Sequence, residues 1–307
     1  MQEIRIGVIG AGTMGLRVLQ ALKAHRAYKV VGIYDPDAGA QARAHALVPD
    51  LPLSASAAGL SRQRGLDALY IASPPAFHLE HLRLARHAGV AVLCEKPLAA
   101  SLADVAAIDR LALPRCAVNF PFACLPAVRQ LLDITGSGAI GEFAEARITL
   151  RFAQWPRGWQ RGAAEWLGMP EQGGFTREVL SHFLFLALRL FGPLDLASYQ
   201  LERTPGKTET ALRAQLRHAA GVLDIDAAVR GTIEDANCFE WQGSRGSARL
   251  HDWYRFEATG VAPVAPVDPT PYTLDAFARA FRGQADTGLA TVSEARQVAE
   301  LVERLLA

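Results

Sequence analysis

Short apolar runs alternate with amphipathic stretches along the first 120 residues. The runs are rich in branched residues, as buried strands are. Their ranges are 4–9, 30–34, 68–72, 90–94 and 116–119, with helical spacing at about 77–87 and 101–111. Strands that alternate with helices predict parallel pairing. We therefore expect an α/β fold that begins with a Rossmann domain, a doubly wound parallel sheet.

The pattern changes after about residue 121. A helix is predicted at 125–134, a long strand at 143–152, and a buried helix at 176–190. The strand-like runs that follow lie at 195–201, 209–217, 220–229, 237–242 and 246–251. No helical pattern separates these runs, which favours antiparallel pairing. We expect a C-terminal α+β domain with an open, mostly antiparallel sheet.

Two domains follow from these patterns. We expect a dinucleotide-binding domain at 1–121 and a substrate-binding and oligomerisation domain at 122–307. The C-terminal helix is free to pack back on the first domain. One face of the second sheet is expected to lie under the central helix. The other face is expected to pair with a second subunit, giving a homodimer or homotetramer.

Composition narrows the class of protein. Half of the 307 residues are hydrophobic, the formal net charge is +1, and the four cysteines are scattered without C-x-x-C spacing. This balance gives no reason to expect a nucleic-acid partner, a disulfide framework or a metal site. No apolar run reaches the roughly 18 residues of a membrane helix, and no signal peptide precedes Ile4. We expect a cytoplasmic protein without a membrane partner.

The first strand leads into a glycine-rich turn with the pattern G-x-G-x-x-G. The residues expected to contact a dinucleotide there are Gly10, Gly12, Thr13, Met14 and Gly15. In this motif the glycines allow a tight turn, the approach of a pyrophosphate and close packing of helix on strand. Asp35 ends the next strand, twenty residues after Gly15. Its carboxylate is suited to the adenosine ribose and would repel a 2′-phosphate, so NAD is favoured over NADP. Arg43 is the residue that would weaken this preference.

Other polar residues stand at the ends of the later strands. Ser73 and Pro74 follow the third strand, Glu95 and Lys96 end the fourth, and Asn119 ends the last. Carboxyl ends of parallel strands meet at one sheet edge, where ligands bind. We expect all five at the dinucleotide, together with His78, which opens the following helix and either touches the cofactor or caps the helix.

Taken together, these motifs resemble the Gfo/Idh/MocA family, named for glucose–fructose oxidoreductase, inositol dehydrogenase and a rhizopine-catabolism protein. The residues that carry the resemblance are GAGTMG at 10–15, Asp35, Ser73-Pro74-Pro75 with His78, Glu95-Lys96-Pro97, and Gly173-Gly174 followed by His182. The resemblance spans essentially the whole chain. It implies a pyridine-nucleotide enzyme that acts on a sugar, a polyol or a similar hydroxyl compound, with a C-terminal sheet used in oligomerisation.

The resemblance also implies site residues. Lys96 matches the family's catalytic lysine and His182 the histidine of the second domain's central helix. Glu178 stands where the family usually has aspartate, and Leu180 where it often has glycine. Glu178 and His182 lie four residues apart, hence on one helix face. We expect Glu178 to orient the imidazole, His182 to move the hydroxyl proton, and Lys96 to polarise the reacting oxygen.

A loop rich in tryptophan and arginine lies at 154–174. We expect Trp155 and Trp159 to stack on a sugar, and Arg157 and Arg161 to hold a carboxylate or phosphate. Packing on a neighbouring subunit is an equal alternative for this loop. The leading hypothesis is an NAD(P)-dependent oxidoreductase of a small hydroxyl compound. The alternatives are a non-catalytic dinucleotide-binding regulator and an NAD-dependent glycosidase.

Overall fold

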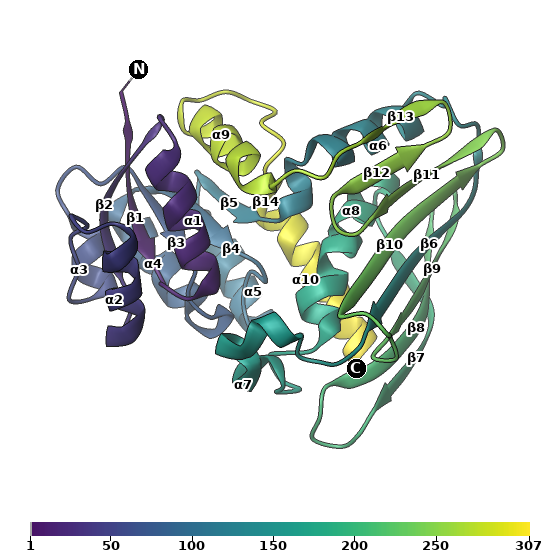
Figure 1. Cartoon of the computed structure of the whole chain (residues 1–307), viewed down its shortest axis with the longest axis horizontal. Helices are drawn as coiled ribbons and strands as arrows, with labels where there is room; N and C mark the ends of the chain where they lie inside the picture. The colour runs from purple at the N-terminus through teal and green to yellow at the C-terminus, as the bar shows by residue number, and fades with distance from the viewer. Residues whose placement is uncertain (1) are drawn as a thin grey trace. The chain divides into compact units, whose positions relative to one another are not determined.

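The structure is a computed structural model that describes residues 2–307, apart from the side chain of Arg161. The chain forms two compact units (Figure 1). The first comprises Met1–Ala123 and Pro269–Arg296, and the second Cys124–Asp268 and Gln297–Ala307. The units differ from the ranges expected from the sequence chiefly because residues 269–296 belong with the N-terminal part of the chain.

The first unit contains a six-stranded sheet of the order β14-β5-β4-β3-β1-β2. Its strands are β1 (Ile4–Ile9), β2 (Tyr28–Tyr34), β3 (Ala68–Ile71), β4 (Ala91–Glu95), β5 (Cys116–Asn119) and β14 (Ala290–Thr291). All neighbouring pairs are parallel except β14 with β5. The predicted parallel sheet is therefore confirmed. The strand order reverses between β1 and β3, and such a switch point is where open α/β sheets bind ligands.

The helices of the first unit accompany this sheet. They are α1 (Thr13–Ala24), α2 (Ala38–Leu47), α3 (Ala57–Ser61), α4 (His78–Ala88), α5 (Leu102–Arg110) and α9 (Pro269–Phe281). The buried face of α1 repeats at helical spacing through Val18, Leu19 and Leu22. These side chains share one core cluster with strand residues such as Tyr70 and with Phe277 of α9. Burial of such apolar side chains fixes where the strand ends lie.

The second unit contains an eight-stranded sheet of the order β13-β12-β11-β10-β6-β9-β8-β7. Its strands are β6 (Phe143–Phe152), β7 (Asp195–Arg203), β8 (Glu209–His218), β9 (Gly221–Ala228), β10 (Asp235–Gly243), β11 (Gly246–His251), β12 (Arg255–Ala258) and β13 (Val261–Val264). Only β6 and β9 pair in parallel. The mostly antiparallel sheet is confirmed, whereas the sequence analysis missed β12 and β13. Pro263 is compatible with β13 because that strand lies at the sheet edge.

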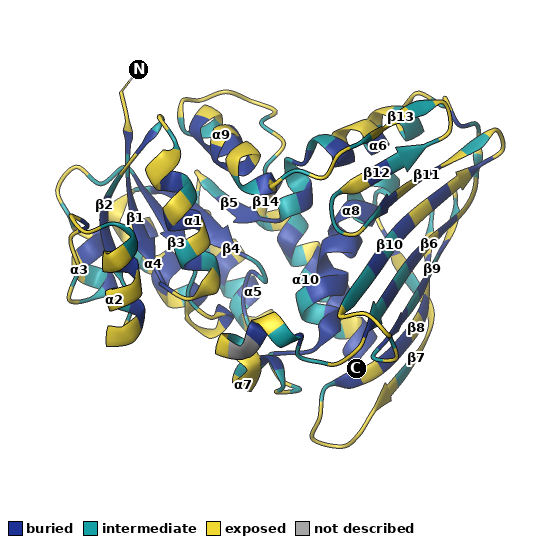
Figure 2. Cartoon of the chain, in the orientation of Figure 1, coloured by how far each residue is buried: buried dark blue, intermediate teal, exposed yellow. Residues whose placement is uncertain are grey.

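One face of this sheet is covered and the other is exposed. Along β8, Leu212 and Leu216 are buried whereas Arg213 and Arg217 are exposed, and Figure 2 shows similar alternation on neighbouring strands. The helices of the second unit include α6 (Pro126–Gly136), α7 (Ala164–Leu167) and α8 (Ser181–Phe191), and α10 (Val292–Leu306) spans both units. Residues 181–187 of α8 are all buried, as predicted for the central helix.

Candidate functional site

The turn between β1 and α1 is built on three glycines in different steric settings. Gly10 has φ +98°, and a Cβ on it would lie 2.5 Å from the carbonyl carbon of Ala72. A Cβ on Gly15 would overlap the carbonyl oxygen of Gly10, whereas the space around Gly12 is open. Helix α1 begins after Gly12 without a side-chain cap. The turn therefore leaves an open cradle at amide groups, which fits a pyrophosphate.

The first turn of α1 also has no negative charge that would repel an anion. Thr13 is exposed, Met14 is half-buried, and the first turn of α1 contains no acidic residue. A carboxylate at this position would compete with an anionic ligand for the amides and for the positive end of the helix dipole. Residues 13 and 14 thus leave the cradle accessible.

Asp35 connects the end of β2 to this glycine turn. Its Oδ2 accepts a hydrogen bond from the amide of Ala11 at 2.6 Å, and its Oδ1 accepts one from the amide of Asp37 at 2.9 Å. The half-buried carboxylate therefore lies beside the cradle, where a ribose reader belongs. Arg43 lies nearby on α2, with its Nη2 3.8 Å from Asp37 Oδ1. Asp35 thus follows the end of β2, and Arg43 lies on the next helix.

The loop after β3 is tied to the loop after β4 by a histidine. His78 is fully buried, with its Nε2 2.8 Å from the carbonyl oxygen of Ser73 and its Nδ1 3.2 Å from that of Leu98. Ser73 Oγ lies 2.9 Å from Nδ1 of His81. Pro74 is exposed at the tip of the loop. These contacts set the path of the chain directly after Lys96 and Pro97.

Burial lowers the pKa of His78 to about 4. Near neutral pH the ring is therefore uncharged and has one N–H, which the shorter contact assigns to Nε2. A ring that is fully buried and faces two carbonyl oxygens cannot also present itself to a cofactor. The side chain of His78, expected either to touch the cofactor or to cap the helix, contacts the loops after β3 and β4.

Three buried polar side chains meet at the ends of β3, β4 and β5. Glu95 Oε1 accepts hydrogen bonds from Tyr70 Oη and, at 2.9 Å, from Asn119 Nδ2. Burial raises the pKa of Tyr70 well above its ordinary value, so the phenol remains a donor. Lys96, half-buried, follows Glu95 directly. The trio thus fixes the backbone from which Lys96 projects. Tyr70 was missed in the sequence because it reads as one more apolar strand residue.

In the second unit, the two glycines before the central helix have separate steric roles. A Cβ on Gly173 would overlap the backbone of Leu167, and Gly174 has φ +93°. A Cβ on Gly174 would also overlap the carboxyl group of Glu209, whose Oε1 accepts the amide of Thr176 at 2.7 Å. Burial raises the pKa of Glu209. Gly174 therefore lets this carboxyl group approach the start of the helix, whereas Gly173 allows close packing on the backbone of Leu167.

The residues at 176–180 form a π-helical turn rather than the expected α-helix, and α8 continues from Ser181. Such turns are frequent at functional sites. Glu178 lies in this turn and His182, which is buried, lies in α8. Glu178 Oε1 is 3.3 Å from Gln160 Nε2 and 3.8 Å from Arg157 Nη2. These contacts link Glu178 to the 154–174 loop, a partner that the sequence analysis did not foresee.

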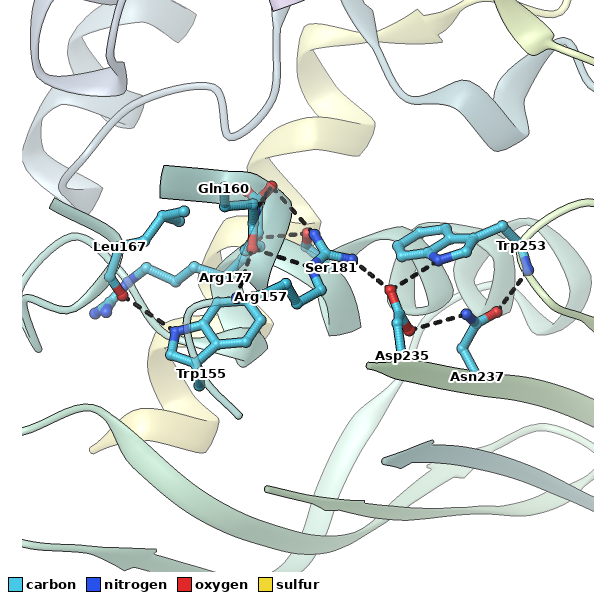
Figure 3. Close-up of polar contacts among 10 residues, drawn as sticks. Trp155, Arg157, Gln160, Leu167, Arg177, Ser181, Asp235, Asn237 and Trp253 are labelled. Carbon is cyan, nitrogen blue, oxygen red and sulfur yellow. Dashed lines mark hydrogen bonds and ion pairs between the residues drawn. The ribbon is translucent and has the colours of Figure 1, made fainter. Parts of the chain in front are cut away.

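Arg157, which is buried, is the centre of a cluster of polar and aromatic side chains (Figure 3). Its Nη1 donates to Asp235 Oδ2 at 2.5 Å and its Nε to Gln160 Oε1 at 3.0 Å. Its guanidinium carbon lies 5.7 Å from the ring centre of Trp155 and 4.8 Å from that of Trp159. The guanidinium of Arg157, expected to hold a carboxylate or phosphate of a ligand, is thus already paired with Asp235 and Gln160. The side chain of Arg161 lies outside the described part.

The two indoles predicted to contact a substrate differ in setting. Trp155 donates from Nε1 to the carbonyl oxygen of Leu167 at 3.1 Å and is half-buried. Trp159 is 54% exposed. One face of the Trp159 indole is therefore covered by Arg157 whereas much of the ring remains accessible. Of the two, only Trp159 offers a broad apolar surface to a ligand.

A third indole at this cluster was missed in the sequence. Trp253, between β11 and β12, donates from Nε1 to Asp235 Oδ2 at 2.9 Å, and its ring centre lies 5.4 Å from that of His182. Asn237 Oδ1 accepts the amide of Trp253 at 2.7 Å. No local sequence motif predicts this arrangement, because its residues come from separate helices, strands and loops.

The described residues contain neither a candidate metal site nor a candidate membrane span. Within residues 2–307 there is no group of three or more His, Cys, Asp or Glu side chains that could hold a metal ion. Among the same residues, no helix is both long and apolar enough to cross a bilayer. The polar clusters at the strand ends of the first unit and around Arg157 in the second therefore remain the candidate sites.

Comparison with known proteins agrees with these observations. Residues 4–115 match the model of the Gfo/Idh/MocA oxidoreductase family, described by its NAD-binding Rossmann fold. A D-apiose dehydrogenase from Paraburkholderia graminis is 29% identical over 286 residues, which cover 87% of this chain and 74% of that protein. An inositol 2-dehydrogenase from Corynebacterium glutamicum is 30% identical over 151 residues, which cover 48% of this chain and 45% of that enzyme. The chain thus spans under half of the second relative.

Among solved structures, an oxidoreductase from Agrobacterium radiobacter in complex with NAD+, L-tartaric acid and magnesium is similar over nearly the whole chain. The TM-score is 0.84 at 20% identity, with 98% of this chain and 95% of that chain covered. At this identity the likeness establishes the fold alone. The second unit, which lies outside the residues matched by the family model, thus shares its fold with that solved structure.

Proposed function

This chain belongs to the Gfo/Idh/MocA oxidoreductase family, and we propose that it transfers hydride between a nicotinamide cofactor and a hydroxyl or carbonyl group of an uncharged sugar or polyol. The observation that carries the proposal is the cradle at Gly12. It is open, lies at the uncapped start of α1, and is bordered by the Asp35 carboxylate. A phosphate-and-ribose ligand matches all three properties.

NAD is the proposed cofactor, and it would accept or donate the hydride at its nicotinamide ring. The amides after Gly12 would hold the pyrophosphate, and Asp35 would accept hydrogen bonds from the adenosine ribose. A 2′-phosphate would place negative charge against Asp35, which disfavours NADP.

Lys96 is proposed to stabilise negative charge on the reacting oxygen. It follows the buried trio of Tyr70, Glu95 and Asn119, so its backbone is held firmly at the strand end. A cation held in place in advance lowers the barrier because little reorganisation is needed as the oxyanion develops. Ser73 and Asn119 are proposed to border the cofactor from neighbouring strand ends.

His182 is proposed to take the hydroxyl proton during oxidation and to return it during reduction. Its position directly after a π-helical turn supports this role. Glu178, one turn earlier, is proposed as a positioning residue. Its contacts to Gln160 and Arg157 hold the start of the helix rather than the substrate.

The charge of the Arg157 cluster supports an uncharged substrate. The single guanidinium faces two carboxylates, Asp235 at 2.5 Å and Glu178 at 3.8 Å. An anionic substrate would have to compete with both for a cation that is already neutralised. Trp159 instead offers an exposed indole, and indoles pack well on the apolar faces of sugar rings.

A homodimer or homotetramer in the cytoplasm is proposed as the assembly, formed through the exposed face of the eight-stranded sheet. Charged side chains line this face, including Arg147, Glu240 and Arg249 around a cavity of about 440 Å³. An interface there would depend on ion pairs, which salt screens. Light scattering at low and high salt checks this, with dissociation expected at high salt.

The activity is tested by incubating the protein with NAD+ and a panel of hydroxyl compounds. The panel contains myo-inositol, D-apiose and D-glucose, with D-glucuronate as the anionic counterpart of glucose. We expect reduced nicotinamide to form with at least one neutral compound and glucose to be preferred to glucuronate. Failure of the whole panel, together with failure to bind NADH, would refute the proposal. A preference for glucuronate would refute the uncharged substrate.

A further inference from the structure

We infer that Trp253 is a positioning residue for His182, and that the Arg157–Asp235–Asn237 cluster holds its indole against the imidazole. The inference rests on the proposed role of His182 in proton transfer. It adds a residue from a turn between two strands of the second unit, which the motifs of the sequence did not single out.

The first observation is the contact between the rings. The ring centres of His182 and Trp253 lie 5.4 Å apart with an interplanar angle of 87°, an edge-to-face arrangement. Such geometry is favourable for aromatic pairs and depends on orientation. Phe183 contacts the same indole at 6.0 Å and 42°. A rotation of the imidazole about its side-chain bonds would break the edge-to-face contact, so Trp253 restricts the ring orientations open to His182.

The second observation is the backbone that presents Trp253. Asp252 and Trp253 both have positive φ, +46° and +67°, a region that residues with a side chain rarely occupy. The amide of Trp253 donates to Asn237 Oδ1 at 2.7 Å, and the amide of Asp252 donates to the carbonyl oxygen of Asn237 at 3.1 Å. A strained turn persists only when its surroundings fix it, and such turns cluster at functional sites.

The third observation is the anchor of the indole. Asp235 Oδ2 accepts both Trp253 Nε1 at 2.9 Å and Arg157 Nη1 at 2.5 Å, while its Oδ1 accepts Asn237 Nδ2 at 3.1 Å (Figure 3). The guanidinium carbon of Arg157 lies 5.6 Å from the centre of the Trp253 ring. The indole is therefore fixed at its N–H edge and against a cation.

The same cluster also reaches the helix segment before His182. Arg157 Nη2 lies 3.8 Å from Glu178 Oε1, and Glu178 belongs to the π-helical turn that precedes α8. The histidine is thus flanked by two elements that share one buried arginine. A role in packing alone accounts poorly for this, because the Trp253 side chain is only half-buried whereas Arg157 and Asn237, which contact it, are buried.

The test uses two substitutions in the full-length protein. Trp253→Leu removes the aromatic ring, whereas Trp253→Phe keeps a ring but loses the N–H to Asp235. With the neutral compound that turns over fastest, we expect Trp253→Leu to lower kcat by about 10- to 100-fold with a much smaller change in KM. Trp253→Phe should recover part of that loss. Tyr199→Leu, an exposed aromatic residue on β7, is the matched control.

A second measurement needs no substrate. In protein labelled with nitrogen-15 histidine, the His182 ring signals are identified by their absence in His182→Gln. The indole ring current should displace these signals in the wild type, and Trp253→Leu should abolish the displacement. Unchanged signals, or an unchanged kcat in Trp253→Leu, would overturn the inference. If Trp253→Leu abolishes the displacement but the wild-type protein turns over no substrate, the result counts against the proposed reaction and not against the contact between Trp253 and His182.

Discussion

The carboxylate of Asp35 accepts the amide of Ala11 at 2.6 Å, so the end of β2 and the glycine turn after β1 are held together directly. One residue thereby shapes the cradle and faces the space where a ribose would lie. In the proposed function this single strand-end acid would serve both the turn and the choice of cofactor, and substitution tests the second role.

Asp35→Ser should shift the cofactor preference towards NADPH. The shorter, neutral side chain removes the repulsion of a 2′-phosphate, and Arg43 lies on the neighbouring helix α2. We expect the Kd for NADH to rise by about tenfold and that for NADPH to fall. Asp50→Ser, at an exposed acid outside the turn, should change neither. Titration by nicotinamide fluorescence measures both Kd values. An unaltered ratio of the Kd for NADH to the Kd for NADPH would show that Asp35 does not bind the adenosine ribose.

Gly12→Ala and Gly15→Ala form a matched pair of one-methyl changes. Gly12 has ordinary φ and open surroundings, so its alanine variant should fold like the wild type but bind NADH more weakly, because the methyl group enters the cradle. At Gly15 the methyl group would overlap Gly10, so that variant should lose thermal stability. Calorimetry with NADH titration separates the two effects. Equal NADH affinity in the wild type and Gly12→Ala would contradict the cradle.

His78 should make the protein less stable in mild acid. Its pKa is about 4 in the folded state, below the value of 6.5 expected when unfolded, so the unfolded chain binds the extra proton between these values. Stability therefore falls as pH drops through this window, by about 2 kcal/mol between about pH 7 and pH 5. Urea titrations of the wild type and His78→Gln at both pH values give the free energies of unfolding. The difference between the two proteins in the loss on acidification is the contribution of His78. If both lose the same free energy, the ring is not held neutral.

Asp235→Ala should be strongly destabilising. It leaves the Arg157 guanidinium, whose side chain is 3% exposed, without its nearest carboxylate. Removing one partner of a buried ion pair costs about 3–5 kcal/mol. Glu202→Ala breaks an exposed pair with Arg230 and should cost less than about 1 kcal/mol. Chemical denaturation compares the two variants, and similar losses would show that the Arg157 cluster contributes no more than a surface pair.

Lys96→Met should abolish most turnover while leaving dinucleotide binding intact. Loss of one group that stabilises an oxyanion typically lowers the rate by about 100- to 1,000-fold. Methionine keeps the unbranched shape and most of the length of the side chain, so the fold at the end of β4 should persist. Lys207→Met, at an exposed turn, is the control. Steady-state rates and NADH affinity are both required, and wild-type turnover would exclude Lys96 from the chemistry.

The sequence predicted the features that depend on local patterns. Branched apolar runs located the strands, and G-x-G-x-x-G located the turn. What it missed is non-local. Tyr70 reads as a core residue until β4 and β5 bring Glu95 and Asn119 to its hydroxyl. Likewise, Arg157 meets Asp235 and Trp253 across 78 and 96 positions of the chain, and only the sheet register brings them together.

The π-helical turn is a second case. Residues 176–190 have the apolar pattern of one continuous helix, and nothing in the spacing of Glu178 and His182 signals a wider turn. The steric demands of Gly173 and Gly174 against Leu167 and Glu209 become visible only in three dimensions. Local patterns therefore predicted the helix, whereas its irregular start depends on tertiary packing.

The central claim is that the cradle between β1 and α1 holds a nicotinamide dinucleotide. Parallel fluorescence titrations of the purified wild-type protein with NADH and NADPH test it most directly. We expect saturable NADH binding, markedly weaker NADPH binding, and weaker NADH binding in Gly12→Ala than in the wild type. Absence of saturable binding by either dinucleotide would contradict the account, since the open cradle and Asp35 would then serve no dinucleotide at all.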